Sequence, residues 1–199
     1  MRILLIGATG TIGTAVHEAL TTRGHDVLAA SRSSSEWPVD IDEPKTITSV
    51  FEKAGPLDGV ACAAGSVPYG PWESMDHDQW MTGINSKLLG QVELTRQAVT
   101  SLPAGGSVTL ITGVLAREPV RTASVAAAVG GALESWVVTT AAELFGRIRI
   151  NAISPTVLSE SAERYQDIFP GFPSVPAVEV AQAYVRSIEG LDTGRIYQV

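Results

Sequence analysis

Short apolar segments alternate with longer amphipathic segments along the chain. Mostly apolar runs without polar alternation predict strands buried on both faces, at residues 3–6, 26–30, 60–63, 107–112 and 149–153. Helical spacing is found at residues 12–23, 44–54, 77–101, 125–145 and 177–190, and residues 194–199 are expected to form a last strand. This alternation predicts one α/β domain over residues 1–199, with a Rossmann-type doubly wound parallel sheet.

The least regular segment is 156–176, which contains Pro170, Gly171, Pro173 and Pro176. Structureless loops of this length are uncommon in compact domains unless they act as lids or binding loops. The segment follows a predicted strand, at the sheet edge where open α/β sheets bind their ligands. We therefore expect a binding loop here, with a short helix near residues 159–167.

Composition and charge narrow the possible partners. The chain has 199 residues, 45% of them apolar, and its 21 acidic and 14 basic side chains give a net charge of −7 without a basic run. This balance argues against nucleic acid or an anionic membrane surface as the main partner. A small-molecule substrate or ligand is the expectation instead.

Metal and disulfide chemistry are not expected. Cys62 is the single cysteine, and His17, His25 and His77 are scattered without a second ligand at metal-binding spacing. No run reaches the roughly 18 uninterrupted apolar residues of a membrane span. The first residues are interpreted as a buried strand and not as a signal peptide, so a cytoplasmic location is expected.

A glycine-rich turn follows the first predicted strand and opens a helix. Gly7 permits the tight turn, Gly10 lets the main chain approach a pyrophosphate, and Gly13 allows close helix–strand packing. The free N–H groups of the helix end then face the anion. The alternative is a tight β-α turn without a ligand, but its position in a strand–turn–helix unit favours dinucleotide binding.

The end of the second predicted strand bears on the choice of cofactor. An Asp or Glu usually meets the ribose 2′-hydroxyl there, whereas this chain has Ser31-Arg32-Ser33. Arg32 can pair with a 2′-phosphate or stack on adenine, unless it is simply solvated. NADP(H) is therefore favoured over NAD(H).

At this point the chain resembles the short-chain dehydrogenase/reductase family over nearly its whole length. Its glycine turn matches the family's TGxxxGxG with the middle glycine one place early. Residues 39–42, Val-Asp-Ile-Asp, look like the segment after the family's third strand, and residues 62–65 stand where the family has Asn-Asn-Ala-Gly. Residues 149–156 are close to the family's IRVNAIAPG. The resemblance and the glycine turn together indicate these cofactor-binding residues: Gly7, Thr9, Gly10, Thr11, Ile12, Gly13, Arg32, Asp40, Ile41, Ala63, Ala64, Gly65, Pro155 and Val157.

The resemblance also shows what is missing. Counting back along the helix, Ala126 and Gly130 stand at the positions of the family's catalytic Tyr and Lys, and Gly113 stands at that of its Ser. In the family the Tyr protonates the product oxygen, and the Lys lowers the phenol pKa and holds the nicotinamide ribose. Loss of a positioned general acid typically costs about 10²- to 10⁴-fold in rate.

Few residues offer a replacement. Asn85 matches the family's helix Asn, which holds a water in a proton relay, and the Thr112 hydroxyl neighbours Gly113; both are candidate catalytic residues. Tyr165 in the long loop and Arg117 after the strand at 107–112 are substrate-binding candidates. Each also has a structural interpretation, as a strand-end hydroxyl, a packed phenol or a solvated charge.

The helix over residues 125–145 is unusual in its own right. Two adjacent glycines inside a helix cost about 1 kcal/mol each relative to Ala, so Gly130 and Gly131 predict close approach of a partner helix or a ligand. The resemblance implies a homodimer or homotetramer. Two functions remain open: an atypical NADP(H)-dependent oxidoreductase, or a non-redox dinucleotide-binding regulator or catalyst on the same fold.

Overall fold

The computed structural model describes all 199 residues, and its core is a parallel sheet of six strands. The strand order is β2-β1-β3-β4-β5-β8, so the chain runs outward from β1 in both directions. All neighbouring strands pair in parallel, and β3 and β4 are buried along their whole length. The strands are β1 (Arg2–Ile6), β2 (Asp26–Ala30), β3 (Gly59–Cys62), β4 (Ser107–Ile111), β5 (Arg149–Ser154) and β8 (Ile196–Gln198).

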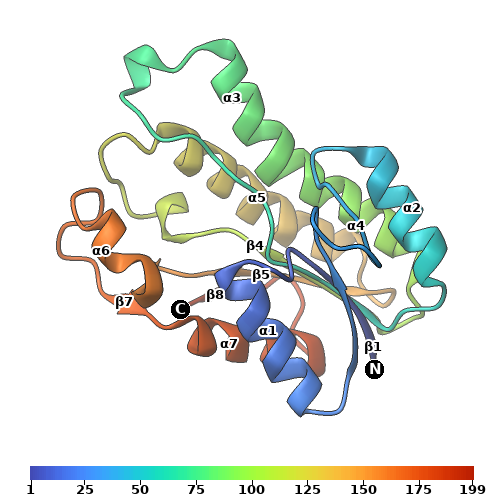
Figure 1. Cartoon of the computed structure of the whole chain (residues 1–199). Coiled ribbons are helices and arrows are strands. Elements are labelled where there is room, and N and C mark those ends of the chain that lie inside the picture. The colour runs from blue at the N-terminus through green and yellow to red at the C-terminus, as the bar shows by residue number, and fades with distance from the viewer.

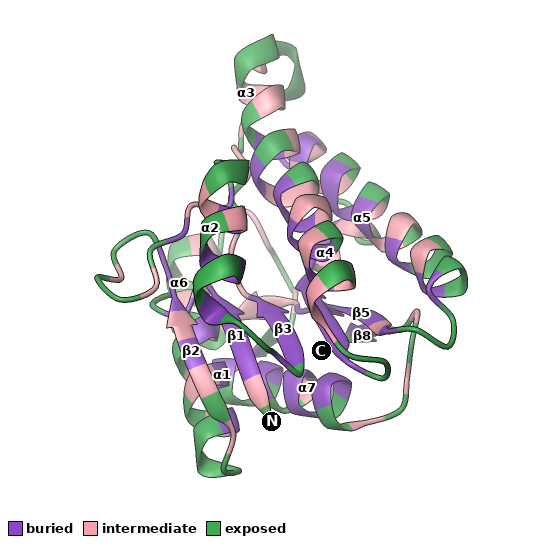
Figure 2. Cartoon of the chain, turned by 90° about the vertical axis from the view of Figure 1, so that its right-hand side faces the viewer, coloured by how far each residue is buried: buried purple, intermediate pink, exposed green.

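Helices cover both faces of this sheet (Figure 1). One face carries α1 (Thr11–Thr22) and α7 (Ala177–Glu189), and the other carries α2 (Pro44–Ala54), α4 (Gly90–Ser101) and α5 (Ser124–Glu143). The buried residues concentrate in the strands and in the inward faces of these helices, while α3 (His77–Gly83) extends outward and has Gly83 as its single buried residue (Figure 2). The predicted fold class is confirmed.

The helix predicted over 77–101 forms in three parts. Asp76 and Gln79 form a reciprocal capping box at the start of α3, and a π-helical segment, η2 (Ile84–Leu89), then joins α3 to α4. The Gly90 N–H donates to the Asn85 carbonyl five residues back. Such wide turns are frequent at functional sites.

The strand that precedes the matched segment 39–42 in the family is absent here. Residues 39–42 were matched to the segment after that strand, but only an isolated bridge between Ser31 and Pro38 marks its place, so β2 is the edge of the sheet. The Ser- and Pro-containing stretch between them lacks the apolar run that a buried strand needs.

The long loop after β5 carries some structure of its own. It contains a two-stranded pair, β6 (Val157–Leu158) with β7 (Ser174–Val175), and η4 (Ser159–Ser161) followed by α6 (Ala162–Tyr165). These two short helices lie inside the range predicted for a helix. The Glu160 carboxylate accepts from the Ala177 N–H and so caps the start of α7.

Helix α5 is the one helix long and apolar enough to cross a membrane by length and composition. In the fold it packs on β5, with Leu133, Val137 and Ala141 buried in the common core. Packing against the sheet therefore accounts for its apolar character.

Candidate functional site

The glycine turn after β1 is built so tightly that side chains are excluded from it. Gly7 has φ +84°, and a Cβ on it would lie 2.8 Å from the Ala63 carbonyl carbon. A Cβ on Gly13 would lie 2.0 Å from the Gly7 carbonyl oxygen. The two glycines let β1, the loop after β3 and α1 meet without side chains between them.

The start of α1 is open to an anion. Gly10 caps the helix without any side-chain hydrogen bond, and no acidic residue stands in the first turn. The Gly10 N–H donates to the Gly7 carbonyl, but no protein acceptor meets the N–H groups of Thr11, Ile12 and Gly13. Free N–H groups and the helix dipole make this end suitable for a phosphate.

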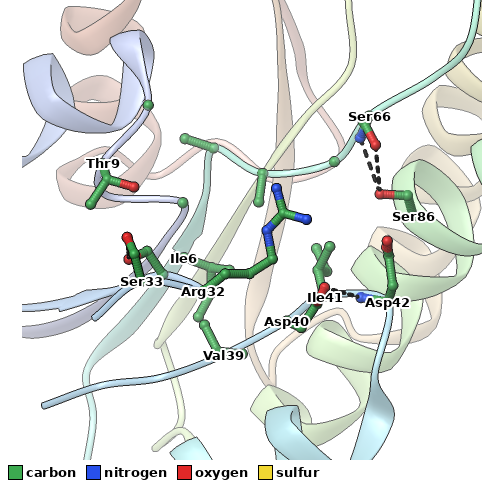
Figure 3. Close-up of a pocket in the computed structure, with 16 residues that line it drawn as sticks. Ile6, Thr9, Arg32, Ser33, Val39, Asp40, Ile41, Asp42, Ser66 and Ser86 are labelled. Atoms are coloured by element: carbon green, nitrogen blue, oxygen red, sulfur yellow. Dashed lines mark hydrogen bonds between the residues drawn. The ribbon is translucent and has the colours of Figure 1, made fainter. Parts of the chain in front are cut away.

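A cavity of about 390 Å³ lies beside this turn, along the carboxyl ends of β1, β2 and β3 (Figure 3). Nine of the fourteen predicted cofactor residues line it, and its lining residues include Gly7, Thr9, Gly10, Arg32, Asp40, Ile41, Ala63, Ala64 and Gly65. Thr11, Ile12 and Gly13 lie in the first turn of α1 beside it. Pro155 and Val157 lie at the end of β5 and in β6, outside the cavity wall.

Arg32 reaches into the middle of this cavity (Figure 3) and forms no ion pair within the chain. It also lines a neighbouring hollow of about 370 Å³ together with Lys45, Thr46 and Ser49. Asp40 lines both spaces, and its carboxylate accepts from the Asp42 N–H at 3.1 Å. Arg32 thus borders the cavity at its β2 end, and Lys45 borders the neighbouring hollow.

The loop after β3 is held against η2. The Ser66 N–H donates to the Ser86 hydroxyl at 3.1 Å (Figure 3). Gly65, with φ +115°, approaches Lys87 so closely that a Cβ on it would lie 3.2 Å from the Lys87 Cδ. In the same way, a Cβ on Gly90 would lie 2.5 Å from the Ile41 carbonyl oxygen. Glycines therefore allow η2 and α4 to pack directly against the cavity wall.

The ends of β4 and β5 carry a different arrangement, which centres on Glu134 of α5. The Glu134 carboxylate accepts hydrogen bonds from the Thr112 hydroxyl at 2.8 Å, from the Ser154 hydroxyl at 2.8 Å, and from Arg117 Nη1 at 2.6 Å. A second Arg117 nitrogen donates to Ser154 at 3.0 Å. We call these four residues the Glu134 network.

The comparisons with known proteins agree on the family. The family model described as Enoyl-(Acyl carrier protein) reductase matches residues 7–187. The chain belongs to the short-chain dehydrogenase/reductase family. No protein of curated function matches it.

Solved structures of similar proteins cover this family member from end to end. The protein lin1944 from Listeria innocua is 39% identical, with a TM-score of 0.96 over 100% of this chain and 99% of that one. A small-chain dehydrogenase is 30% identical, with a TM-score of 0.86 and coverage of 100% and 95%. Another, crystallised in complex with NADPH, is 28% identical, with a TM-score of 0.88 and coverage of 100% and 96%.

In this family member the chain itself fills the space beside Gly130. A Cβ on Gly130 would lie 3.4 Å from the Ala116 Cβ in the turn η3 (Val114–Ala116), and one on Gly131 would lie 3.9 Å from the Ala116 carbonyl oxygen. We predicted approach of a partner helix or a ligand to these glycines. In the structure the turn η3 of the same chain contacts them, while approach of a partner helix or a ligand stays a prediction.

Two of the candidate replacements are committed to the Glu134 network. Thr112 is buried, and its hydroxyl donates to Glu134, with the Ile153 carbonyl 3.3 Å away as a second acceptor. Arg117 is bound to Glu134 and Ser154, although it also borders a cavity of about 480 Å³ with Glu118 and part of the long loop. This geometry assigns Thr112 a structural position.

The other two candidates lie apart from each other. Asn85 is exposed and borders a hollow with Ile41, Asp42 and Pro44, on the outer side of η2. Tyr165 ends α6, and its ring centroid lies 6.5 Å from that of Tyr69 in the loop after β3. Burial, with the nearby Tyr165, raises the pKa of the Tyr69 phenol. The structure therefore does not bring Asn85, Thr112 and Tyr165 into one constellation.

Sequence reasoning missed several of these residues. Glu134 is one of only two charged residues in the apolar helix α5, and that isolation was the available signal. Lys87 is one of only three lysines and stands two places after Asn85. Whether Asn85 or Lys87 faces the sheet depends on the π turn, which the sequence did not predict. Tyr69 carried no signal, because its contact with Tyr165 joins loops far apart in the sequence.

Proposed function

We propose that the protein binds NADP(H) in the cavity beside the glycine turn and acts as an oxidoreductase on a small carbonyl or hydroxyl compound. The observation that carries the proposal is the unpaired Arg32 side chain inside that cavity, with Lys45 in the adjoining hollow. A 2′-phosphate would be held there by charge-assisted hydrogen bonds. The NADPH complex of a 28% identical relative supports the same choice.

The dinucleotide fits the residues present. Gly7 and Gly13 leave room where a Cβ would close the turn, and free N–H groups at the start of α1 face outward for the pyrophosphate. From there the cofactor would extend along the carboxyl ends of β3 and β4 toward Pro155 and Val157. When bound, it supplies or accepts the hydride.

A substrate would enter where the loops after β3 and β5 meet. The rings of Tyr69, Tyr165, Phe169 and Phe172 follow one another at centroid distances of 6.5, 6.4 and 5.4 Å. This chain of aromatic rings, which we call the aromatic rim, favours a substrate with an apolar part.

The cofactor half of the proposal is tested by calorimetry with NADPH and NADH on the purified protein. We expect NADPH to bind at least 10-fold more tightly than NADH. Arg32→Ala is expected to weaken NADPH binding about 10- to 100-fold, the loss that follows from removing charged hydrogen bonds worth about 1.5–3 kcal/mol, and to change NADH binding little. Equal affinity of the wild type for both nucleotides contradicts the preference for NADP(H).

A second function is favoured by the two positions of α5 at which the family has its catalytic Tyr and Lys. Ala126 and Gly130 offer no proton, and Thr112 is committed to Glu134, which suits a non-redox regulator or catalyst that only binds the dinucleotide. The two functions separate in an absorbance assay at saturating NADPH across a panel of aldehydes and ketones. An oxidoreductase reduces at least one compound, whereas a regulator binds NADPH and reduces none.

A further inference from the structure

Lys87 lies in η2 against Gly65, a residue that lines the cofactor cavity. Its Cδ and Cα lie 3.2 and 3.3 Å from the position of a Cβ on Gly65, which lines the cavity at the end of β3. One turn further along the helix, the Gln91 side chain donates to the Ile111 carbonyl and accepts from the Ile111 N–H, both at 2.9 Å. Lys87 therefore lies at the carboxyl ends of β3 and β4, on the path from Gly7 to Pro155.

The Lys87 ammonium makes no hydrogen bond or ion pair within the chain. Desolvation lowers the pKa of Lys87, and the Cys62 thiol opposes that shift only in part. The Glu134 carboxylate is bound by Arg117. Lys87 is half-buried, and a partly desolvated cation without a protein partner is unfavourable for folding; such groups concentrate at functional sites.

The other candidate positions at these strand ends either carry no polar side chain or are already hydrogen-bonded within the chain. Gly113, Ala126 and Gly130 carry no polar side chain, and the Thr112 hydroxyl donates to Glu134. Lys87 is the one lysine near these strand ends, since Lys45 and Lys53 belong to α2. We propose that the Lys87 ammonium donates hydrogen bonds to the nicotinamide ribose hydroxyls of bound NADP(H) and supplies the proton that the substrate oxygen takes up.

This role rests on the proposed function. It assigns the cationic side chain of the site to η2, whereas the family's Lys stands at the position of Gly130 in α5. The bound cofactor supplies the hydride. The carbonyl oxygen, which keeps the electron pair of the broken C=O π bond, takes one N–H proton from Lys87. The resulting neutral amine regains a proton from the solvent. A lowered pKa of Lys87 eases the first of these steps, release of the proton to the substrate oxygen.

Protection of the lysines from reductive methylation tests the contact without a mutation. The free protein and the protein with saturating NADPH are treated with formaldehyde and a borohydride reagent, and each lysine is quantified by peptide mass spectrometry. We expect NADPH to slow methylation of Lys87 at least 10-fold. Lys53 of α2, whose ammonium lies over the Trp37 ring, is the internal control, and its methylation rate should change less than 2-fold. A Lys87 that reacts equally with and without NADPH, or that is unreactive in the free protein, overturns the contact.

Two substitutions of Lys87, with one control variant, test the effect on NADPH affinity and on the reaction rate. Lys87→Met is expected to weaken NADPH binding at least 10-fold, while Lys87→Arg and the control Lys53→Met stay within about 3-fold of the wild type. For any carbonyl compound that the wild type reduces, Lys87→Met should lower the rate at least 100-fold. If Lys87→Met reduces that compound at the wild-type rate, or if no compound in the panel is reduced, the proton-donor role is contradicted.

The outcomes separate this inference from the function on which it rests. A wild type that fails to bind NADPH contradicts the proposed function and the Lys87 role together. A wild type that binds NADPH, with Lys87 unprotected and Lys87→Met binding equally well, contradicts only the Lys87 role.

Discussion

The two halves of the carboxyl edge of the sheet are built by opposite means. At the ends of β1 and β3, glycines remove side chains so that Gly7, Gly13 and Gly65 leave a cavity and an open helix start. At the ends of β4 and β5, glycine at position 130 lets the turn η3 pack on α5, and the Glu134 network occupies the edge with side chains. The same residue type therefore opens one half and closes the other.

This difference shows which part of the family's site is tightly constrained by the fold and which part can vary. The ends of β1 and β3 depend on backbone geometry, which tolerates little change. A Cβ on Gly13, 2.0 Å from the Gly7 carbonyl oxygen, cannot be accommodated without moving the chain. The second half depends on which side chains fill a space, and a different set can fill it. Recognition of the cofactor and the chemistry done on it can thus diverge separately within one fold.

The largest expected effect is at the glycine turn. Gly13→Ala places a Cβ against the Gly7 carbonyl, and we expect NADPH binding to fall at least 100-fold and the free energy of unfolding to drop by about 3 kcal/mol, the upper part of the usual range for overpacking. The matched control is Gly131→Ala, also inside a helix but with 3.9 Å of room, which should be neutral or stabilising. Calorimetry and urea unfolding measure both. Equal effects at the two glycines would show that close approach is not what matters.

Rebuilding the family pair should fail. In Ala126→Tyr with Gly130→Lys, the lysine stem must pass the Ala116 side chain, so it displaces η3. We expect a loss of about 2 kcal/mol in unfolding free energy, within the range for small-to-large changes, and no gain in carbonyl reduction. Gly113 also lacks the family's hydroxyl. Robust carbonyl reduction by the double variant would show that only two side chains separate this site from that of its family.

The Glu134 network should matter for stability and little for cofactor binding. Glu134→Ala leaves the buried Thr112 hydroxyl and the Arg117 guanidinium without their common acceptor, and we expect a loss of about 2 kcal/mol in unfolding free energy. NADPH affinity should stay within 3-fold, because none of these residues lines the cavity of about 390 Å³. A loss of affinity larger than the loss of stability would place the network in the binding site.

The smallest expected effect is at the far end of α1. Arg23 and His25 hydrogen-bond the Glu189 carboxylate at the end of α7 and lower its pKa to about 2. Because the folded pKa is depressed, this stabilisation is present above the ordinary glutamate pKa and is lost as the pH falls from about 4.5 to about 2. The contact is exposed to solvent and therefore contributes little to stability. Glu189→Gln should lower the melting temperature by about 2 °C at pH 7 and have no effect near pH 2, with Glu18→Gln as control. An undiminished difference at pH 2 contradicts this assignment.

The fold and the cofactor turn could be predicted because they depend on local patterns. Buried strands show as apolar runs, and Pro44–Ala54 is bounded by its own starting proline and following glycine. The family resemblance at residues 39–42 could not show that the family's third strand is reduced to the Ser31–Pro38 bridge, because a matched segment says nothing about pairing upstream of it. The Glu134 network was missed because Thr112, Glu134 and Ser154 lie up to 42 residues apart, and no periodicity connects them.

The π turn of η2 makes the surroundings of the cofactor sensitive to chain length. A π turn holds one more residue than an α-helical turn, so removing one residue between Ile84 and Leu89 would convert it to an ordinary turn and change which side chains of this segment face the strand ends. Lys87 would then leave the strand ends, and Ser86 would lose Ser66. A single-codon deletion or insertion, with no change in residue chemistry, is thus a short evolutionary route between relatives that present different side chains from this helix.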